Sequence, residues 1–137
     1  MPVIAHQELE KQISKIVQAM GSSAEEANTV AHNLVLANLK GHDSHGVGMI
    51  PRYVEAFLEG ALKINQACHV QSDLGSLLVL DAQQGYGQVV GEQACKWALS
   101  VPKSMVAASS LYPTHIIWDG LDTLQKLLRV MVWYRFI

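Results

Sequence analysis

The stretch GHDSHGVGMIPRY, from Gly41 to Tyr53, places two histidines, an aspartate and a serine in four consecutive positions between glycines. The segments on both sides have the apolar spacing of amphipathic helices. The polar cluster is therefore predicted to lie in a tight loop between two helices, where rigid neighbours commonly hold reactive groups. This loop is both a landmark of the fold and a candidate site.

Two helices are predicted before the loop. Apolar residues between positions 8 and 20 follow one helical face, which stops at Gly21, the residue type preferred just past a helix end. Ser23 and Glu26 form the capping-box pattern that begins a second helix. Its apolar face continues until Gly41, so the second helix leads directly into the polar cluster.

A third helix and then strands are predicted after the loop. Pro51 suits the first turn of a helix, because its missing N–H would be unpaired there anyway, and the helix is expected to end before Gly60. The runs HVQS (69–72) and SLLVLDA (76–82) are short, aliphatic or β-branched, and bounded by turn residues, which indicates strands. The segment GYGQVVGEQACKWA (85–98) returns to helical spacing.

These elements predict an α+β fold in three regions. Residues 1–65 form a helical bundle that carries the loop, and residues 66–98 start an αβ domain whose sheet stays incomplete. Residues 99–137 lack consistent local signals, because prolines stand without turn partners and the segment ends in an apolar and aromatic run. Apolar surface left uncovered in such a chain predicts poor solubility or self-association.

Composition argues against several classes of partner. A net charge of −2 provides no concentrated basic surface for nucleic acid and no reason to expect an anionic membrane. We expect no membrane span and no signal peptide, since the apolar stretches are short and the start of the chain lacks a basic segment. Cys68 and Cys95 lie far apart without disulfide-framework or zinc-site spacing, which indicates reduced thiols in a cytoplasmic protein.

The residues of the loop allow three interpretations. His42, Asp43 and His45 are suitable metal ligands, but a catalytic zinc usually draws one ligand from a distant segment, so no metal is predicted. A histidine beside Ser44 and between glycines could act as a general acid and base, because its pKa lies nearest neutrality. The third interpretation is a polar loop in which Asp43 or Ser44 caps a turn.

A glycine pattern further along is a weaker candidate. Gly85, Gly87 and Gly91 give G-x-G-x-x-x-G, one residue longer than the dinucleotide fingerprint G-x-G-x-x-G. No acidic residue follows at the end of a second strand, as that fingerprint requires. We interpret the glycines as parts of a turn and a helix start, and we assign no cofactor-binding residue.

Two blocks of the chain closely resemble the N-terminal part of the type 2 malate/L-lactate dehydrogenase family: GHDSHGVGMIPRYVEAFLEGALKIN (41–65) and VLDAQQGYGQVVGEQA (79–94). The resemblance runs from about Glu8 to Ala98, and S-H-G followed by a proline and a tyrosine is its most specific element. The family includes ureidoglycolate, sulfolactate and other 2-hydroxycarboxylate dehydrogenases, and some ketoacid and cyclic-imine reductases.

The resemblance implies hydride transfer between NAD or NADP and C2 of a 2-hydroxy or 2-keto acid, on a fold distinct from the Rossmann type. It maps His45 onto the catalytic histidine of the family and places Ser44 beside it as a substrate-binding residue. Many members have an arginine at the position of Met49, where a guanidinium can bind the substrate carboxylate in a bidentate way. Arg52 is the residue expected to substitute here. The complete family protein is commonly a homodimer.

The segment after Ala98 lacks two motifs with which the family continues, A-K-E-H-G and N-S-H-H-x-G-R-x-G. Suppose that one base was lost near the codon of Ala98. Each original codon would then consist of the last base of one present codon and the first two bases of the next. Four adjacent pairs would then force a glycine or a valine where the family expects one. They are Met105–Val106, Trp118–Asp119 and Met131–Val132 for glycine, and Trp133–Tyr134 for valine. We therefore expect residues 99–137 to be out of frame and non-native, with no chemistry at His115.

Three functional hypotheses follow. The preferred one is an NAD(P)-dependent 2-hydroxycarboxylate dehydrogenase, of which this chain is a truncated and inactive N-terminal portion with His45 as acid and base. The second is a non-catalytic helical fragment that associates with a partner. The third is a small metal-dependent enzyme built on His42, Asp43 and His45. The sequence leaves open the substrate, the choice between NAD and NADP, and the physiological direction.

Overall fold

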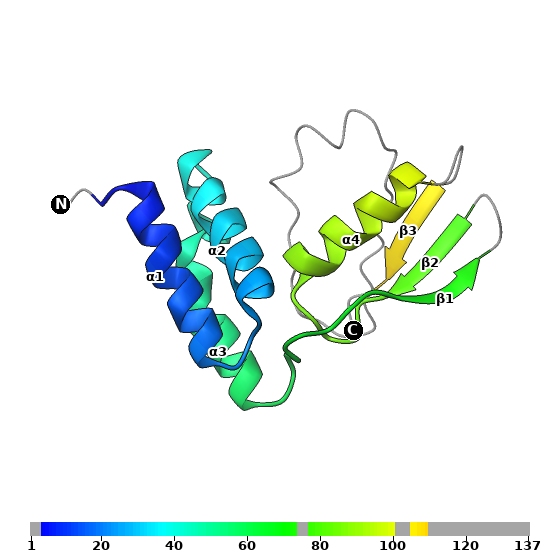
Figure 1. The fold of residues 1–137 in the computed structure, drawn as a ribbon, viewed down its shortest axis with the longest axis horizontal. Coiled ribbons are helices and arrows are strands. Elements are labelled where there is room, and N and C mark those ends of the chain that lie inside the picture. Colours follow the sequence, from blue (N-terminus) through cyan, green and yellow to red (C-terminus); the bar gives the residue numbers. More distant parts are fainter. Residues whose placement is uncertain (1–3, 74–76, 101–104, 110–137) are drawn as a thin grey trace. The chain divides into compact units, whose positions relative to one another are not determined.

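The chain adopts an α+β fold, as the sequence predicts. A computed structural model describes residues 4–73, 77–100 and 105–109. The chain divides into two compact units between Asn65 and Gln66 (Figure 1). Helices make up the first unit, and a small sheet with one helix makes up the described part of the second. No helix in the described ranges is both long enough and apolar enough to cross a membrane.

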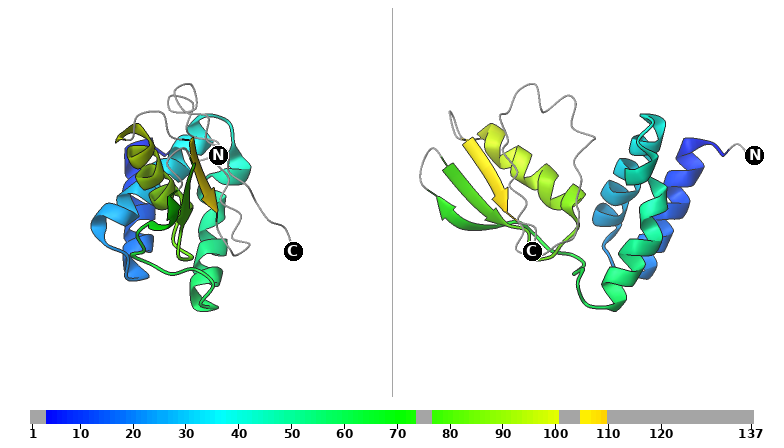
Figure 2. Two further views of the ribbon diagram at one scale, coloured as in Figure 1. Left: turned by 90° about the vertical axis from the view of Figure 1, so that its right-hand side faces the viewer. Right: turned by 180° about the vertical axis from the view of Figure 1, so that it is seen from behind.

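The first unit contains three α-helices and two single-turn 3-10 helices. Figure 2 shows the three α-helices grouped together, with the predicted polar loop between the second and third. Their bounds agree with the sequence prediction to within two residues, because strong apolar stripes and glycine stops mark them. The elements are α1 (His6–Ala19), α2 (Ala24–Leu39), η1 (Asp43–His45), η2 (Val47–Met49) and α3 (Ile50–Leu58).

The core of this unit lies mainly between α1 and α2. Val17 of α1 and Val30 of α2 are fully buried, and Leu34 and Val35 are 1 % exposed. These positions belong to the helical stripes that the sequence predicts, so the two helices pack as an antiparallel pair around them. Gly21 ends the first of these helices with a backbone φ of +104°, a conformation that favours glycine.

The start of α2 corrects one detail of the predicted capping box. Ser23 is the N-cap, and its Oγ accepts from the backbone N–H of Glu26 at 3.2 Å, as predicted. The reciprocal bond is replaced: the N–H of Ser23 donates to Oδ1 of Asn65 at 2.7 Å. The buried Glu26 carboxylate instead accepts from the N–H of Asn65, at 3.0 and 2.9 Å. A distant residue thus joins the end of the unit to the first turn of α2.

The second unit contains a three-stranded sheet of order β1-β2-β3. β1 (His69–Asp73) pairs antiparallel with β2 (Leu77–Asp81), and β2 pairs parallel with β3 (Met105–Ser109). α4 (Gly87–Ser100) connects the two parallel strands and runs alongside the sheet (Figures 1 and 2). The predicted strands and helix of residues 69–98 are therefore confirmed, and β3 adds a strand that the sequence does not predict.

The turn between β2 and α4 contains the glycine pattern. Gly85 lies in the turn and Gly87 is the first residue of α4, in agreement with a turn and a helix start. The left-handed positions belong to Gln83 and Gln84, with φ of 50° and 63°. The N–H of Gln83 donates to Oδ1 of Asp81 at 2.8 Å, which secures the turn. The glycines need no phosphate-binding role to explain their positions.

Candidate active-site loop

The loop leaves α2 through a regular helix ending. Gly41 has φ of +83°, and its N–H donates to the carbonyl of Asn38 at 3.0 Å. The N–H of His42 donates to the carbonyl of Ala37 at 2.9 Å. This pair of bonds is the Schellman arrangement, in which a left-handed glycine reverses the chain. The predicted glycine stop therefore sends His42 and the following residues away from the helix axis.

Two consecutive 3-10 turns then carry the polar cluster. The N–H of His45 donates to the carbonyl of His42 at 3.0 Å, and the N–H of Gly46 donates to that of Asp43 at 3.2 Å. The N–H of Met49 donates to the carbonyl of Gly46 at 3.0 Å, immediately before α3 begins. The loop is thus hydrogen-bonded along its length and holds its side chains on a defined backbone.

The structure brings Ser44 and His45 together. The hydroxyl Oγ of Ser44 lies 2.9 Å from Nδ1 of His45, within hydrogen-bonding distance. Ser44 is exposed and the imidazole is half-buried. A contact at Nδ1 orients the ring and leaves Nε2 as the nitrogen that could exchange a proton with a ligand.

Neither Asp43 nor Ser44 caps a turn in the predicted way. His42 and Gly46, which occupy the N-cap positions of η1 and η2, make no side-chain cap hydrogen bond. Oδ1 of Asp43 instead accepts from Nδ2 of Asn38, at 2.6 Å. Oδ1 of Asn38 accepts from the N–H of Val47, at 2.7 Å. The side chain of Asn38 therefore bridges both 3-10 turns.

Asn38 and Gly46 are residues of this site that the sequence patterns do not indicate. A Cβ on Gly46 would fall inside the amide group of Asn38, 2.7 Å from its Nδ2 and closer still to its other atoms. The only sequence signal is an asparagine near the end of the second helix and a glycine after the histidine. Asparagine and glycine are common at helix ends and in loops, so their presence alone does not predict that these two residues touch.

The two residues considered for the substrate carboxylate lie at the other end of the loop. Met49 is half-buried and precedes α3 directly, while Arg52 is exposed in the first turn of that helix. Pro51 occupies the helix start, as predicted. Arg52 thus follows the loop on a rigid element, and its guanidinium has solvent access.

The metal interpretation gains no support from the described residues. Across residues 4–73, 77–100 and 105–109, no three or more His, Cys, Asp or Glu side chains gather in a way that could hold a metal ion. His42 and Asp43 are exposed, and the hydrogen bond of Asp43 to Asn38 engages one carboxylate oxygen. His115 lies outside the described residues.

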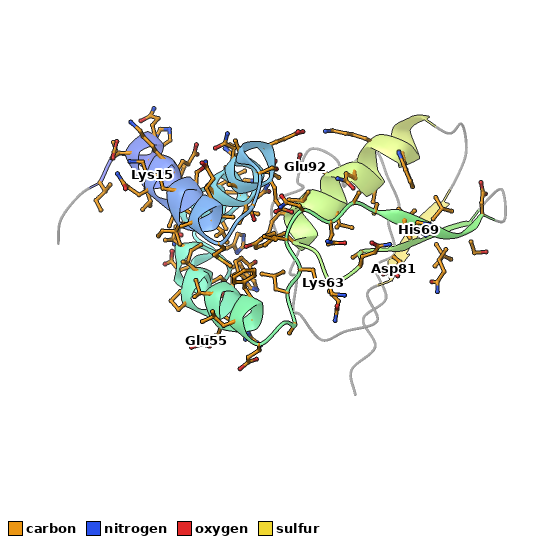
Figure 3. The ribbon with its side chains drawn as sticks, turned by 60° about the horizontal axis from the view of Figure 1, so that its bottom comes forward. Lys15, Glu55, Lys63, His69, Asp81 and Glu92 are labelled. Carbon is orange, nitrogen blue, oxygen red and sulfur yellow. The ribbon has the colours of Figure 1, made fainter. Side chains whose placement is uncertain are left out.

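Among the described residues of the second unit, Cys68 has a clearly displaced pKa. Burial and, to a smaller extent, the negative charge of Asp81 together raise the pKa of the Cys68 thiol to about 11. Asp81 pairs in register with His69 at one end of the β1–β2 ladder, where Figure 3 labels both. The Cys68 Sγ–H donates to the carbonyl of Val90 at 3.6 Å, so this thiol is a structural group rather than a nucleophile.

Comparison with known proteins identifies the family. A model of the malate/L-lactate dehydrogenase family matches residues 4–111, which is well over half of the chain. The chain belongs to the malate/L-lactate dehydrogenase family. The family match includes the loop with Ser44 and His45 and the turn before α4, and it reaches past residue 98 into β3.

Individual members of the family are similar over most of this chain. Hydroxycarboxylate dehydrogenase B of Escherichia coli O157:H7 is 40% identical over 114 residues, which cover 81% of this chain and 31% of the relative. Malate dehydrogenase of Pyrococcus abyssi is 35% identical over 96 residues, or 70% of this chain and 26% of the relative. The chain thus spans about a third of the length of the curated relatives it matches.

A solved structure supports the same fold. The structure of a putative malate/lactate dehydrogenase from E. coli superposes with a TM-score of 0.76 and 34% identity, covering 80% of this chain and 32% of that one. The arrangement of helices and strands described above is therefore that of a region of a malate/L-lactate dehydrogenase family protein.

Proposed function

We propose that this family member is the N-terminal region of an NAD(P)-dependent oxidoreductase that interconverts a 2-hydroxy acid and the corresponding 2-keto acid. The relatives named above are a hydroxycarboxylate dehydrogenase and a malate dehydrogenase, which supports this class of substrate. The observation that carries the proposal is the contact of Ser44 Oγ with Nδ1 of His45 in a loop that the family match includes.

His45 is the proposed proton donor and acceptor. Bound nicotinamide would supply or accept the hydride at C2 of the substrate. In the reductive direction, Nε2 of His45 donates a proton to the substrate oxygen, and in the oxidative direction it takes the hydroxyl proton. Ser44 holds the ring through Nδ1 and is also the proposed hydrogen-bonding partner of the substrate.

Arg52 is the proposed partner of the substrate carboxylate. Its guanidinium can bind two carboxylate oxygens at once, whereas the Met49 thioether offers no donor. We further propose that the complete protein is a cytoplasmic homodimer that binds NAD or NADP on a fold distinct from the Rossmann type. The antiparallel edge strand β1 and the structural roles of Gly85 and Gly87 support this view of the fold.

The reading frame is the second part of this proposal. We propose that residues 99–137 are translated out of frame, from the codon pairs described above. The family match to residue 111 and the strand β3 count against an out-of-frame reading of the first part of this segment, whereas residues 112–137 lie beyond the match. The nucleotide sequence across codons 90 to 140 tests the idea. A frame shifted by one base should read through H-H-x-G-R, and a stop codon or unrelated sequence there contradicts it.

A non-catalytic interaction fragment is the alternative function for the chain as it stands. Leu39 and Leu58, at the ends of two helices of the first unit, are 63 % and 76 % exposed and are the apolar side chains that such a fragment would offer to a partner. Light scattering separates the alternatives, because a fragment made for association should form a discrete complex. Undefined aggregation would favour an incomplete enzyme.

A panel of 2-keto acids tests the enzymatic proposal. The protein made from a gene with one nucleotide restored after codon 98 should oxidise NADH or NADPH with at least one 2-keto acid. The 137-residue chain should give no turnover above its His45→Ala variant. Absence of turnover across the panel in the restored protein would contradict the proposal, and turnover by the short chain would contradict its inactivity.

A further inference from the structure

The side-chain amide of Asn38 bonds the loop that carries His45 through both its oxygen and its nitrogen. Its Oδ1 accepts from the N–H of Val47 at 2.7 Å, and its Nδ2 donates to Oδ1 of Asp43 at 2.6 Å. Asp43 is the first residue of η1 and Val47 is the first residue of η2. One rigid amide on α2 therefore fixes the loop on both sides of His45.

Gly46 makes this arrangement possible. It is buried, and its φ of −90° is accessible to any residue, so backbone conformation does not explain the glycine. Space explains it, because a Cβ would lie within the volume of the Asn38 amide, 2.7 Å from Nδ2. The asparagine and the glycine are sterically matched, and a change in one has consequences for the other.

We propose that Asn38 is a positioning residue for His45 and that Gly46 is its obligatory partner. Asn38 does not reach the substrate in this account. It fixes the two 3-10 turns. The Ser44–His45 contact then forms in one orientation of the imidazole ring, which leaves Nε2 available for proton exchange. The inference rests on the proposed function for its catalytic meaning, but its structural content can be measured without turnover.

Hydrogen exchange of the Val47 amide in the 137-residue chain tests the structural content. Asn38→Ala should raise the exchange rate of the Val47 N–H about tenfold, since it removes the acceptor. It should also change the ring 15N shifts of His45. Asn33→Ala is the matched control: Asn33 lies on the same helix and its Nδ2 donates to the carbonyl of Thr29 at 2.9 Å. This variant should leave both readouts unchanged.

A double-mutant cycle tests the steric match. Gly46→Ala alone should raise Val47 exchange about tenfold, because the new methyl group displaces the amide. In the Asn38→Ala background the same substitution should raise it less than about twofold, because the amide is gone. Additive effects would overturn the proposed pairing. So would unchanged Val47 exchange or unchanged His45 shifts in Asn38→Ala.

A milder variant covers the case in which Asn38→Ala does not fold. Asp43→Ala removes only the Nδ2 contact, and the aspartate is exposed, so α2 should remain intact. It should also raise the exchange rate of the Val47 N–H, by a smaller factor. An unchanged rate would overturn the proposal. In the frame-restored protein, Asn38→Ala should lower kcat about tenfold with a smaller change in KM. If the loop loosens as described but no 2-keto acid is turned over, the enzymatic proposal fails while the positioning geometry stands.

Discussion

Replacing Glu26 by alanine should destabilise the helical unit more than an ordinary change at a helix start. The side chain is 5 % exposed, and its carboxylate accepts from the backbone N–H of Asn65 at 3.0 and 2.9 Å. Losing a hydrogen bond to a charged acceptor costs about 2 kcal/mol. Losing the one buried methylene, Cγ, costs about 0.8 kcal/mol more. Glu26→Ala should therefore lower the free energy of unfolding by roughly 3 kcal/mol.

Two companion variants isolate the cause. Glu26→Gln keeps both methylenes and one acceptor oxygen, so it should cost only about 1 kcal/mol. Glu25→Ala removes the same charge from the same helical turn at an exposed position, and it should cost no more than about 0.5 kcal/mol. These values compare the folded chain with its own unfolded state at pH 7.

Urea unfolding followed by far-UV circular dichroism measures these differences, with linear extrapolation to water. The expected order of stability is Glu25→Ala, then Glu26→Gln, then Glu26→Ala. The reasoning is refuted if the two alanine variants lie within about 1 kcal/mol of each other, because burial and the bond to Asn65 would then contribute little. Equal losses in Glu26→Ala and Glu26→Gln would refute the hydrogen-bond part of the argument.

Two further predictions concern a thiol and a turn. The pKa of Cys68 rises from 9.0 to about 11 in the folded chain, so its thiolate fraction at pH 8 falls about 100-fold. Iodoacetamide should label it correspondingly more slowly than in the urea-unfolded chain, as mass spectrometry of its peptide would show, and equal rates would contradict burial. Because the folded pKa is the higher one, this thiol contributes stability fully below pH 9, and the contribution is lost as pH rises toward 11. Gly21→Ala should cost about 1 to 2 kcal/mol in urea unfolding, because φ is +104° and a Cβ would lie 2.9 Å from Cδ1 of Ile64. Gly48 has no positive φ, and a Cβ there would lie 3.9 Å from the backbone oxygen of Asp43, so Gly48→Ala should lower the free energy of unfolding by under about 0.5 kcal/mol. Equal losses of stability in Gly21→Ala and Gly48→Ala would contradict this explanation.

The helices were predictable because their signals are local. Gly21, Gly41 and Gly60 end the three apolar stripes, and all three have positive φ in the structure. Ser23 was identifiable as an N-cap from its position three residues before Glu26. Such cues depend on neighbours within one or two turns, so the sequence alone contains them.

The unpredicted features depend on contacts between distant residues or on exceptions to a local preference. Asn65 contacts Ser23 across 42 positions, and no spacing rule indicates that pairing. Asn38 bonds the N–H of Val47 in the loop, and this contact could be predicted only if the path of the loop backbone were already known. Gln83 and Gln84 adopt left-handed conformations that local preference assigns to the glycines beside them. The candidate histidine could be proposed from the sequence, but the side chain that fixes its loop could not.

The central claim is that His45 exchanges a proton with a 2-keto or 2-hydroxy acid. It is tested most directly by comparing kcat for NAD(P)H oxidation in the frame-restored protein and its His45→Ala and His42→Ala variants, with the best 2-keto acid. His45→Ala should lower kcat by about 10² to 10⁴, the usual contribution of a general acid, while His42→Ala retains most of the rate. A His45→Ala variant as fast as its parent, or equal losses in the two variants, would contradict the claim.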